Sequence, residues 1–313
     1  MKPDFANAGH FSNGEDMKSL IGRFNRLFYV FALLAGIACA FQAQAVVLGH
    51  VYTTFDCPGS NSTAARSINE RGEIVGGCDD ANGGHGFLLR NGRFTMIDVP
   101  DATETHASGI NNRGDVVGEY VDGADIKHAF LLRNGRFTTI DPPGSILAQA
   151  RGIDDLGRIV GLYIRSDGIF RGFILDSRGF EDILYPDAVR TGPFDINDLK
   201  RVVGSYVDTS GVSHGFLLKK GAFTSIDPPG AAGARAAGIN ILGQIVGLWT
   251  DDPACSSCFT KAFLLTPRGF ESFEFPGALE TVAYDINAAG QIVGSYLGED
   301  GVAHGYLRDR EDE

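Results

Sequence analysis

Basic residues, long apolar runs and short catalytic motifs are all scarce in this chain of 313 residues. Lys and Arg number 27 against 39 Asp and Glu, which gives a formal net charge of −12. A protein that neutralises nucleic-acid phosphates concentrates Lys and Arg instead. The charge balance therefore excludes nucleic acid as the expected partner.

The sequence also lacks the short signatures of common enzymes. It contains no Gly-x-Ser-x-Gly elbow, no His-Glu-x-x-His motif, no phosphate-binding loop and no calcium loop with the required spacing. These absences favour a binding or scaffolding protein over an enzyme. Neither a catalytic residue nor a cofactor is predicted.

Apolar runs are absent after residue 45, and the run before it is short. Three basic residues precede Leu27 to Phe41, and small residues follow up to Ala45, a pattern typical of a cleaved secretory signal. We predict that residues 1–45 are a signal peptide, with an extension upstream of Met17. The alternatives are an uncleaved anchor or a lipoprotein signal ending at Cys39. The mature protein is expected to be bacterial, extracellular or periplasmic, monomeric and free of the membrane.

Glycine, by contrast, is abundant, and much of it recurs at a fixed period. Gly238 to Gly247 reads Gly-Ile-Asn-Ile-Leu-Gly-Gln-Ile-Val-Gly, and the chain holds six copies of this pattern. Successive copies are 42, 43, 43, 43 and 47 residues apart, a spacing in the range of repeat folds. The last glycines of the copies are Gly76, Gly118, Gly161, Gly204, Gly247 and Gly294.

Each copy predicts four short strands. In the second copy, Asn111 to Gly114 suits a tight turn that leads into a β-branched strand, and Asn134-Gly135 is a strong hairpin signal. Four antiparallel strands in about 43 residues, without helical periodicity, are typical of one propeller blade. We predict an all-β, six-bladed β-propeller in one domain, residues 46–313. The expected blades are 60–101, 102–144, 145–187, 188–230, 231–277 and 278–308 plus 51–59.

The two ends of the repeat region complement each other. The sixth copy stops after His304 to Arg308 and lacks its fourth strand, whereas Tyr52 to Gly59 is a good copy of Phe223 to Gly230, the end of a fourth strand. The N-terminal strand is therefore expected to complete the last blade and to leave no free edge. An open solenoid is the alternative.

The repeat resembles a known family. His128-Ala129-Phe130 is the tripeptide after which the extracellular HAF repeat family is named, and variants of it begin at His85, His214 and His304. The resemblance covers residues 51–308 and implies an exported bacterial repeat protein with no assigned reaction. The third and fifth copies depart from the tripeptide, with Arg171 and Lys261 in place of His.

The recurrent His residues are predicted to be structural latches and not metal ligands, because equivalent positions of different blades lie too far apart to meet at one ion. Hairpin register places an acidic residue opposite each of them as a cross-strand partner. The predicted pairs are His85 with Asp98, His128 with Asp141, His214 with Asp227, Lys261 with Glu274, and His304 with Asp56.

Four cysteines remain once Cys39 is removed with the signal, which permits two disulfides with three connectivities. In the predicted ring, Cys57 ends the closing strand, and Cys78 ends the second strand of the first blade. A bridge between them would fasten the closure. Cys255 and Cys258 are expected to form a local disulfide, with a redox pair as the alternative.

The tight turns all fall on one side of the predicted ring, so function is expected on the side of the variable loops. Symmetry is broken there near the axis, as a ligand funnel requires, with drift at a solvent-filled channel as the alternative. The predicted function is binding of a carbohydrate, small-molecule or protein ligand; the alternative is an exported propeller hydrolase acting on glycans or esters. The tentative ligand-binding residues are Arg66, His106, Gln149, Arg151, Phe194, Arg235 and Tyr284.

Overall fold

The computed structural model describes residues 44–47, 49–255 and 258–310, and their secondary structure consists of strands and turns. All the elements that follow lie in the second of two units, Ala40–Glu313. The predicted signal peptide lies outside the described residues apart from Gln44 and Ala45.

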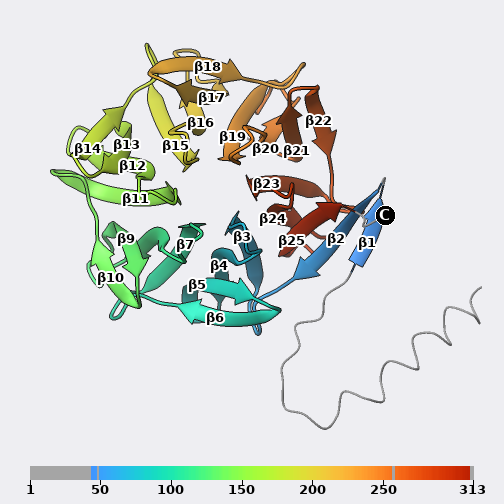
Figure 1. The fold of residues 1–313 in the computed structure, drawn as a ribbon, viewed down its shortest axis with the longest axis horizontal. Helices are drawn as coiled ribbons and strands as arrows, with labels where there is room; N and C mark the ends of the chain where they lie inside the picture. Colours follow the sequence, from blue (N-terminus) through green and yellow to red (C-terminus); the bar gives the residue numbers. More distant parts are fainter. Residues whose placement is uncertain (1–43, 48, 256–257, 311–313) are drawn as a thin grey trace, which may run out of the picture. The chain divides into compact units, whose positions relative to one another are not determined.

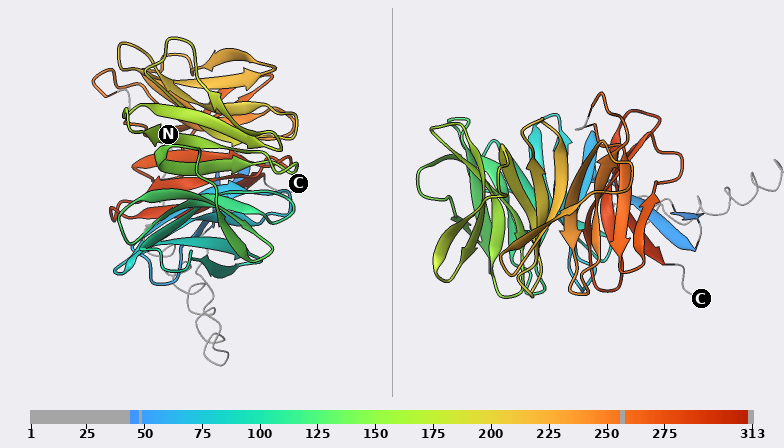
Figure 2. Two further views of the ribbon diagram at one scale, coloured as in Figure 1. Left: turned by 90° about the vertical axis from the view of Figure 1, so that its left-hand side faces the viewer. Right: turned by 90° about the horizontal axis from the view of Figure 1, so that it is seen from above.

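Six antiparallel sheets of the second unit stand around a common axis as the blades of a propeller (Figure 1). The side views in Figure 2 show that the strands run between two faces of the ring, where the turns and loops lie. The strands of the first three blades are β3 (Ser62–Ile68), β4 (Ile74–Asp80), β5 (Gly83–Arg90), β6 (Arg93–Ile97), β7 (Glu104–Ile110), β8 (Val116–Val121), β9 (Lys127–Arg133), β10 (Arg136–Thr139), β11 (Ser145–Ile153), β12 (Ile159–Arg165), β13 (Phe170–Asp176) and β14 (Gly179–Ile183).

The other three blades follow the same order, with the first strand of each at the axis and the fourth at the rim (Figure 1). Their strands are β15 (Arg190–Ile196), β16 (Val202–Val207), β17 (Ser213–Lys219), β18 (Ala222–Ile226), β19 (Gly233–Ile239), β20 (Ile245–Thr250), β21 (Lys261–Thr266), β22 (Gly269–Phe273), β23 (Glu280–Ile286), β24 (Ile292–Leu297), β25 (Ala303–Arg310), β2 (His50–Phe55) and β1 (Gln44–Val47).

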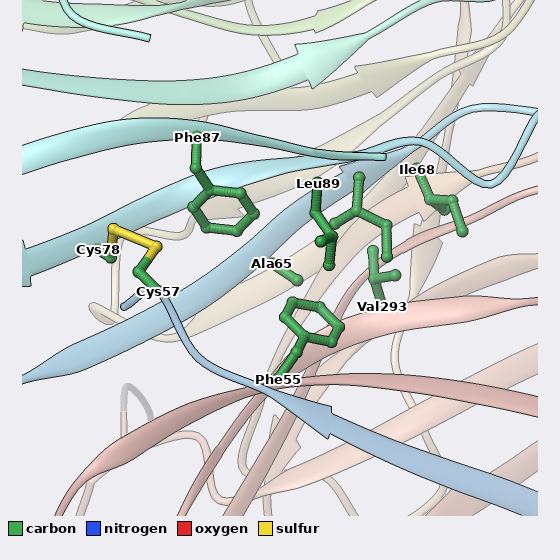
Figure 3. Packing of buried hydrophobic residues seen from close by; sticks show 9 residues of the cluster. Phe55, Cys57, Ala65, Ile68, Cys78, Phe87, Leu89 and Val293 are labelled. Atoms are coloured by element: carbon green, nitrogen blue, oxygen red, sulfur yellow. A yellow bond between two sulfur atoms is a disulfide. The ribbon is translucent and has the colours of Figure 1, made fainter. Parts of the chain in front are cut away.

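The N-terminal strand closes the ring, as the sequence predicts. β2 pairs antiparallel with β25, and the register places Phe55 opposite Gly305. The predicted four-stranded last blade carries one strand more, because β1 pairs with the outer edge of β2. Phe55 is 2% exposed and packs with Phe87 and Val293, so the closing strand joins the core between the first and last blades (Figure 3).

The last glycine of each repeat motif forms one packing unit with the aromatic residue of the following tripeptide. A Cβ atom at Gly118 would lie 2.0 Å from the carbonyl oxygen of His106 and 2.8 Å from the ring of Phe130. The other five motif glycines meet the first-strand carbonyl and the third-strand ring in the same way. The glycine therefore recurs because no side chain fits between these two groups.

We expect Gly118→Ala to lower the free energy of unfolding by about 1–3 kcal/mol or more, because overpacking forces the strands apart. Denaturant unfolding measures the change. Gly123→Ala is the matched control in the same blade, since a Cβ atom there meets nothing within 4 Å. Equal stability of the two variants would contradict the packing explanation.

A disulfide fastens the closing segment to the first blade. Cys57 follows β2 and is bonded to Cys78 in β4, as the sequence predicts, and both residues are buried (Figure 3). Cys255 and Cys258 form the second, local disulfide. The first bridge links residues 21 positions apart, whereas the second spans only three.

The double variant Cys57→Ser/Cys78→Ser should lose about 3 kcal/mol of stability, because the unfolded chain gains the entropy of an open loop. Thermal unfolding of the oxidised proteins tests this expectation. The double variant Cys255→Ser/Cys258→Ser should lose less, since the loop that it opens is much shorter. A larger loss at the local bridge would overturn the role assigned to the closing one.

Candidate functional site: an arginine-lined cavity on the axis

Each innermost strand carries a β-bulge at the same repeat position. In β3 the register shifts between Ala65 and Ser67, so Arg66 is the extra residue. A bulge re-aims the side chain of its extra residue. The equivalent shifts in the other five blades define a set of six bulged residues that all line one cavity of about 190 Å³. These residues are Arg66, Ser108, Arg151, Phe194, Ala237 and Tyr284.

Most of the ligand-binding residues named from the sequence meet at this cavity. Those that line it are Arg66, Arg151, Phe194, Arg235 and Tyr284. Gln149 is not among the lining residues, but its Oε1 accepts a hydrogen bond of 2.6 Å from Arg151. His106 is also not part of the lining and lies 3.4 Å from Asp79.

The ligand-binding residues were expected from the sequence on the side of the variable loops, and this position is wrong for the bulged residues. Arg66, for example, is the fifth residue of the seven-residue strand β3. The bulges lie near the end of each strand that leads into the tight turn. The cavity therefore lies inside the axial channel rather than on the loop surface.

Each arginine of the cavity lies over an aromatic ring. The guanidinium of Arg66 is 5.9 Å from the ring centre of Tyr284, and that of Arg151 is 6.0 Å from Phe194. Arg235 lies 4.4 Å from Phe259. Such cation–π contacts hold a guanidinium in place without using its hydrogen-bond donors.

Several buried polar atoms at the cavity have no hydrogen-bond partner among the described residues. They are the Nε atoms of Arg66, Arg151 and Arg235 and the Oγ atom of Ser108. An unpartnered buried donor costs free energy, and native structures leave few of them. Three arginines whose Nε atoms have no partner in the described part of the chain therefore line one cavity.

Among the carboxylates of the described residues, Glu119 acts on Arg151 and, against the effect of burial, raises its pKa. It is 6% exposed and accepts a hydrogen bond of 3.3 Å from Lys127, while its Oε2 atom has no partner in the described part of the chain. Burial favours the neutral acid, but the positive charges of Arg151, Arg66 and Lys127 outweigh it and lower the pKa of Glu119. Burial outweighs Glu119 in its effect on Arg151 and lowers the pKa of that arginine. One carboxylate therefore faces an excess of cations.

The side-chain charges along the axis change sign toward the tight turns. A second pocket there is lined by acidic residues, among them Glu70, Asp195 and Asp285. Asp285 accepts hydrogen bonds from the Oγ atom of Ser67 at 2.7 Å and the backbone N–H of Ile68 at 2.9 Å. Burial raises the pKa of Asp285 to about 6. Asp195 and Asp285 therefore connect neighbouring blades through hydrogen bonds. Glu70, Asp155 and Asp198 in the same pocket make the turn-side mouth unfavourable for an anion.

The predicted His latches are present in four blades. The Nδ1 atom of each His lies within hydrogen-bond distance of the expected acid, and the structure adds a second acid from the preceding loop. The contacts are His85–Asp98 at 3.1 Å, His128–Asp141 at 2.6 Å, His214–Asp227 at 3.0 Å and His304–Asp56 at 3.0 Å. The last pair spans the ring closure.

The latch expected in the fifth blade is wrong. Lys261 pairs with Asp251 at 2.5 Å and lies 5.0 Å from the ring centre of Trp249, while no contact joins it to Glu274. Its long side chain reaches the preceding loop rather than the neighbouring strand. Arg171 behaves in the same way and pairs with Asp167 at 2.7 Å.

Two latches should make stability depend on pH. Burial opposes protonation of His128 and His304, but their paired carboxylates outweigh it and raise each pKa above 6.5. The folded state thus binds these protons more tightly, so the stabilisation is complete below pH 6.5 and is lost as pH rises through the raised values. We expect the melting temperature to fall above pH 6.5, and to fall less in His128→Gln/His304→Gln. Parallel pH profiles would contradict this role.

Sequence reasoning missed Glu119, Ser108, Ala237, Leu248 and Phe259. Ser108 and Ala237 share the repeat position of Arg66, so alignment of the copies could have found them. Glu119 is the only charged residue at the position after the motif's last glycine. Phe259 stands two residues before Lys261, where other copies carry Ile126, Ile169, Val212 and Val302, so alignment of the copies could have found it too.

The described residues contain no group of three or more His, Cys, Asp or Glu side chains that could hold a metal ion. They form no helix long and apolar enough to cross a membrane.

Comparison with known proteins agrees with the fold. No protein-family model matches the chain, and no curated protein sequence does. Among solved structures, AofleA from Arthrobotrys oligospora is 12% identical, with a TM-score of 0.52 over 82% of this chain and 86% of that one. A putative TolB from Agrobacterium tumefaciens is 14% identical, with a TM-score of 0.55 over 78% and 89%.

A variant of the Aleuria aurantia lectin, in complex with Fucα1-6GlcNAc, is 11% identical, with a TM-score of 0.51 over 79% of this chain and 91% of that one. Likeness at such low identity establishes the architecture alone. The chain is thus a six-bladed β-propeller with an arginine-lined cavity on its axis.

Proposed function

We propose that this protein is an exported binding propeller that holds a carboxylate-bearing carbohydrate in its axial cavity. One observation carries the proposal: Arg66, Arg151 and Arg235 line one cavity, and no acidic residue among those described lines it. A guanidinium binds a carboxylate through two parallel hydrogen bonds, which makes arginine the preferred residue for this group.

Charge balance supports an anionic ligand. The chain has 39 acidic residues and a net charge of −12, yet none of the residues that line the cavity is acidic. Buried charge that lacks a counter-charge is costly. A ligand carboxylate would supply the charge that Glu119 alone does not.

The aromatic rings favour a sugar as the carrier of that carboxylate. Tyr284 and Phe194 line the cavity beside Arg66 and Arg151, respectively. The apolar faces of such rings suit the C–H faces of a pyranose ring. The fold is shared with lectins, one of them solved with a fucose-containing disaccharide. Two disulfides are consistent with the export and the HAF-repeat kinship that we propose from the sequence.

The hydrolase alternative has less support from the geometry. Glycosidases use a pair of carboxylates that flank the scissile bond. Asp195 and Asp285 line the turn-side pocket, but backbone N–H groups of Ile239 and Ile68 occupy one oxygen of each. We therefore assign these two acids to blade-to-blade contacts.

Two substitutions with opposite expected effects test the proposal. Arg151→Gln should weaken galacturonate binding about ten-fold or more, because a charge-assisted hydrogen bond is worth about 1.5–3 kcal/mol. Glu119→Gln should strengthen it, because the substitution removes a negative charge that competes with the ligand for Arg151. Isothermal titration calorimetry measures both affinities.

Galactose is the neutral control for the ligand, and melting temperature is the control for folding. Because Arg151→Gln leaves the buried Glu119 without its strongest positive neighbour, its melting temperature is compared with that of Arg151→Gln/Glu119→Gln, which removes both charges. Weaker binding by both single variants, or equal binding of galactose and galacturonate, would refute an anion site.

A further inference from the structure

We propose, building on the proposed function, that the ligand is an acidic oligosaccharide and that Arg190 binds the carboxylate of a second sugar unit. The unit would lie in a groove between the third and fourth blades that continues the axial cavity. Arg190 would then be a specificity-determining residue for chain length.

The groove and the axial cavity share one wall. The groove encloses about 420 Å³, and Arg151, Phe194 and Arg235 line both spaces. Burial lowers the pKa of Arg235, and the positive charges of Arg151 and Arg190 act in the same direction. Arg190 thus belongs to the same electrostatic cluster as the arginines of the cavity.

Arg190 repeats the arrangement seen inside the cavity. Its guanidinium lies 4.5 Å from the ring centre of Phe170, and both residues line the groove. It is the only basic residue at its repeat position, where Glu104 and Glu280 stand in two other copies. The groove, like the cavity, has no acidic residue in its lining.

Gly192 keeps the groove open. Equivalent positions carry His106, Gln149 and Arg235, so the fold accepts long side chains there. A Cβ atom at Gly192 would meet only Leu162, at an ordinary contact distance of 3.7 Å. A side chain at this position can therefore fill the groove without disturbing the strands.

An acidic chain of sugars suits this path better than an acidic peptide. Each arginine lies beside an aromatic ring, so each carboxylate site includes an apolar face for the ring that carries the acid. The acidic turn-side pocket leaves the groove as the electrostatically favourable entrance for an anion.

The test compares galacturonate with its α-1,4-linked trimer by isothermal titration calorimetry. The trimer should bind the wild-type protein at least ten-fold more tightly than the monomer. Arg190→Gln and Gly192→Gln should each abolish this gain and leave the affinity for the monomer within two-fold. Arg165→Gln is the matched control, because this exposed arginine lies over Tyr163 and does not line the groove.

The outcomes separate the two proposals. If the monomer binds and the trimer binds no more tightly, the groove is not a second sugar site, while the axial site stands. If Arg165→Gln reduces the gain as much as Arg190→Gln, the effect is one of net charge and the assignment fails. If a hexaglutamate peptide binds more tightly than the trimer, the ligand is an acidic peptide, and the oligosaccharide proposal fails. If neither sugar binds, both proposals fall.

Discussion

A ring of side-chain amides around the axis holds the six blades in register. The asparagine of each tight turn donates its Nδ2 hydrogen to the backbone carbonyl of the equivalent residue in the next blade. The last of these bonds, from Asn287 to Asn69 at 3.2 Å, joins the sixth blade to the first. Asp154 has no amide to donate, and Arg158 bridges the gap by donating to the carbonyl of Asn197. The circle is therefore complete in spite of the exception.

Because of this amide ring, the turn end of the propeller is structurally constrained, whereas the rest of each inner strand can vary. Each asparagine also accepts backbone hydrogen bonds within its own turn, so the turn and the contact between blades depend on the same side chain. The turn end cannot vary without loss of both. The remaining length of each inner strand is free to change. The bulges then turn a variable residue of each copy toward the axis, so six divergent residues share one cavity.

Periodic spacing made most of the fold predictable. Turn residues, the motif glycines and the partial blades at the two chain ends identify the ring, its closure and the Cys57–Cys78 bridge, because all of these depend on position along the repeat. The latches followed from hairpin register for the same reason. The partner of Lys261 was not predicted in this way, since the length and charge of its flexible side chain decide the partner, and strand register does not.

The site was less predictable because it depends on features with no local sequence signal. Arg66 and Arg151 stood out as breaks in symmetry, but the bulge that carries them into the channel is a property of strand pairing. Arg190 and Phe170 lie in different blades, and only the assembled ring brings them together. The sequence shows Glu119 as an isolated charge, but only the structure brings it close to Arg66 and Arg151 of the neighbouring blades.

The charge distribution of the ring connects its stability with its function. Acids dominate the surface and the turn-side pocket, where backbone N–H groups satisfy them. Cations dominate the cavity, where burial and mutual repulsion lower the pKa of Arg151 and Arg235. Such a cluster opposes folding, because desolvated like charges repel. The fold tolerates this cluster because the amide ring, the aromatic residues packed on the motif glycines and the closing disulfide stabilise the blades elsewhere. An anion that neutralises the cluster should then stabilise the folded protein as it binds, since binding and relief of repulsion are the same event.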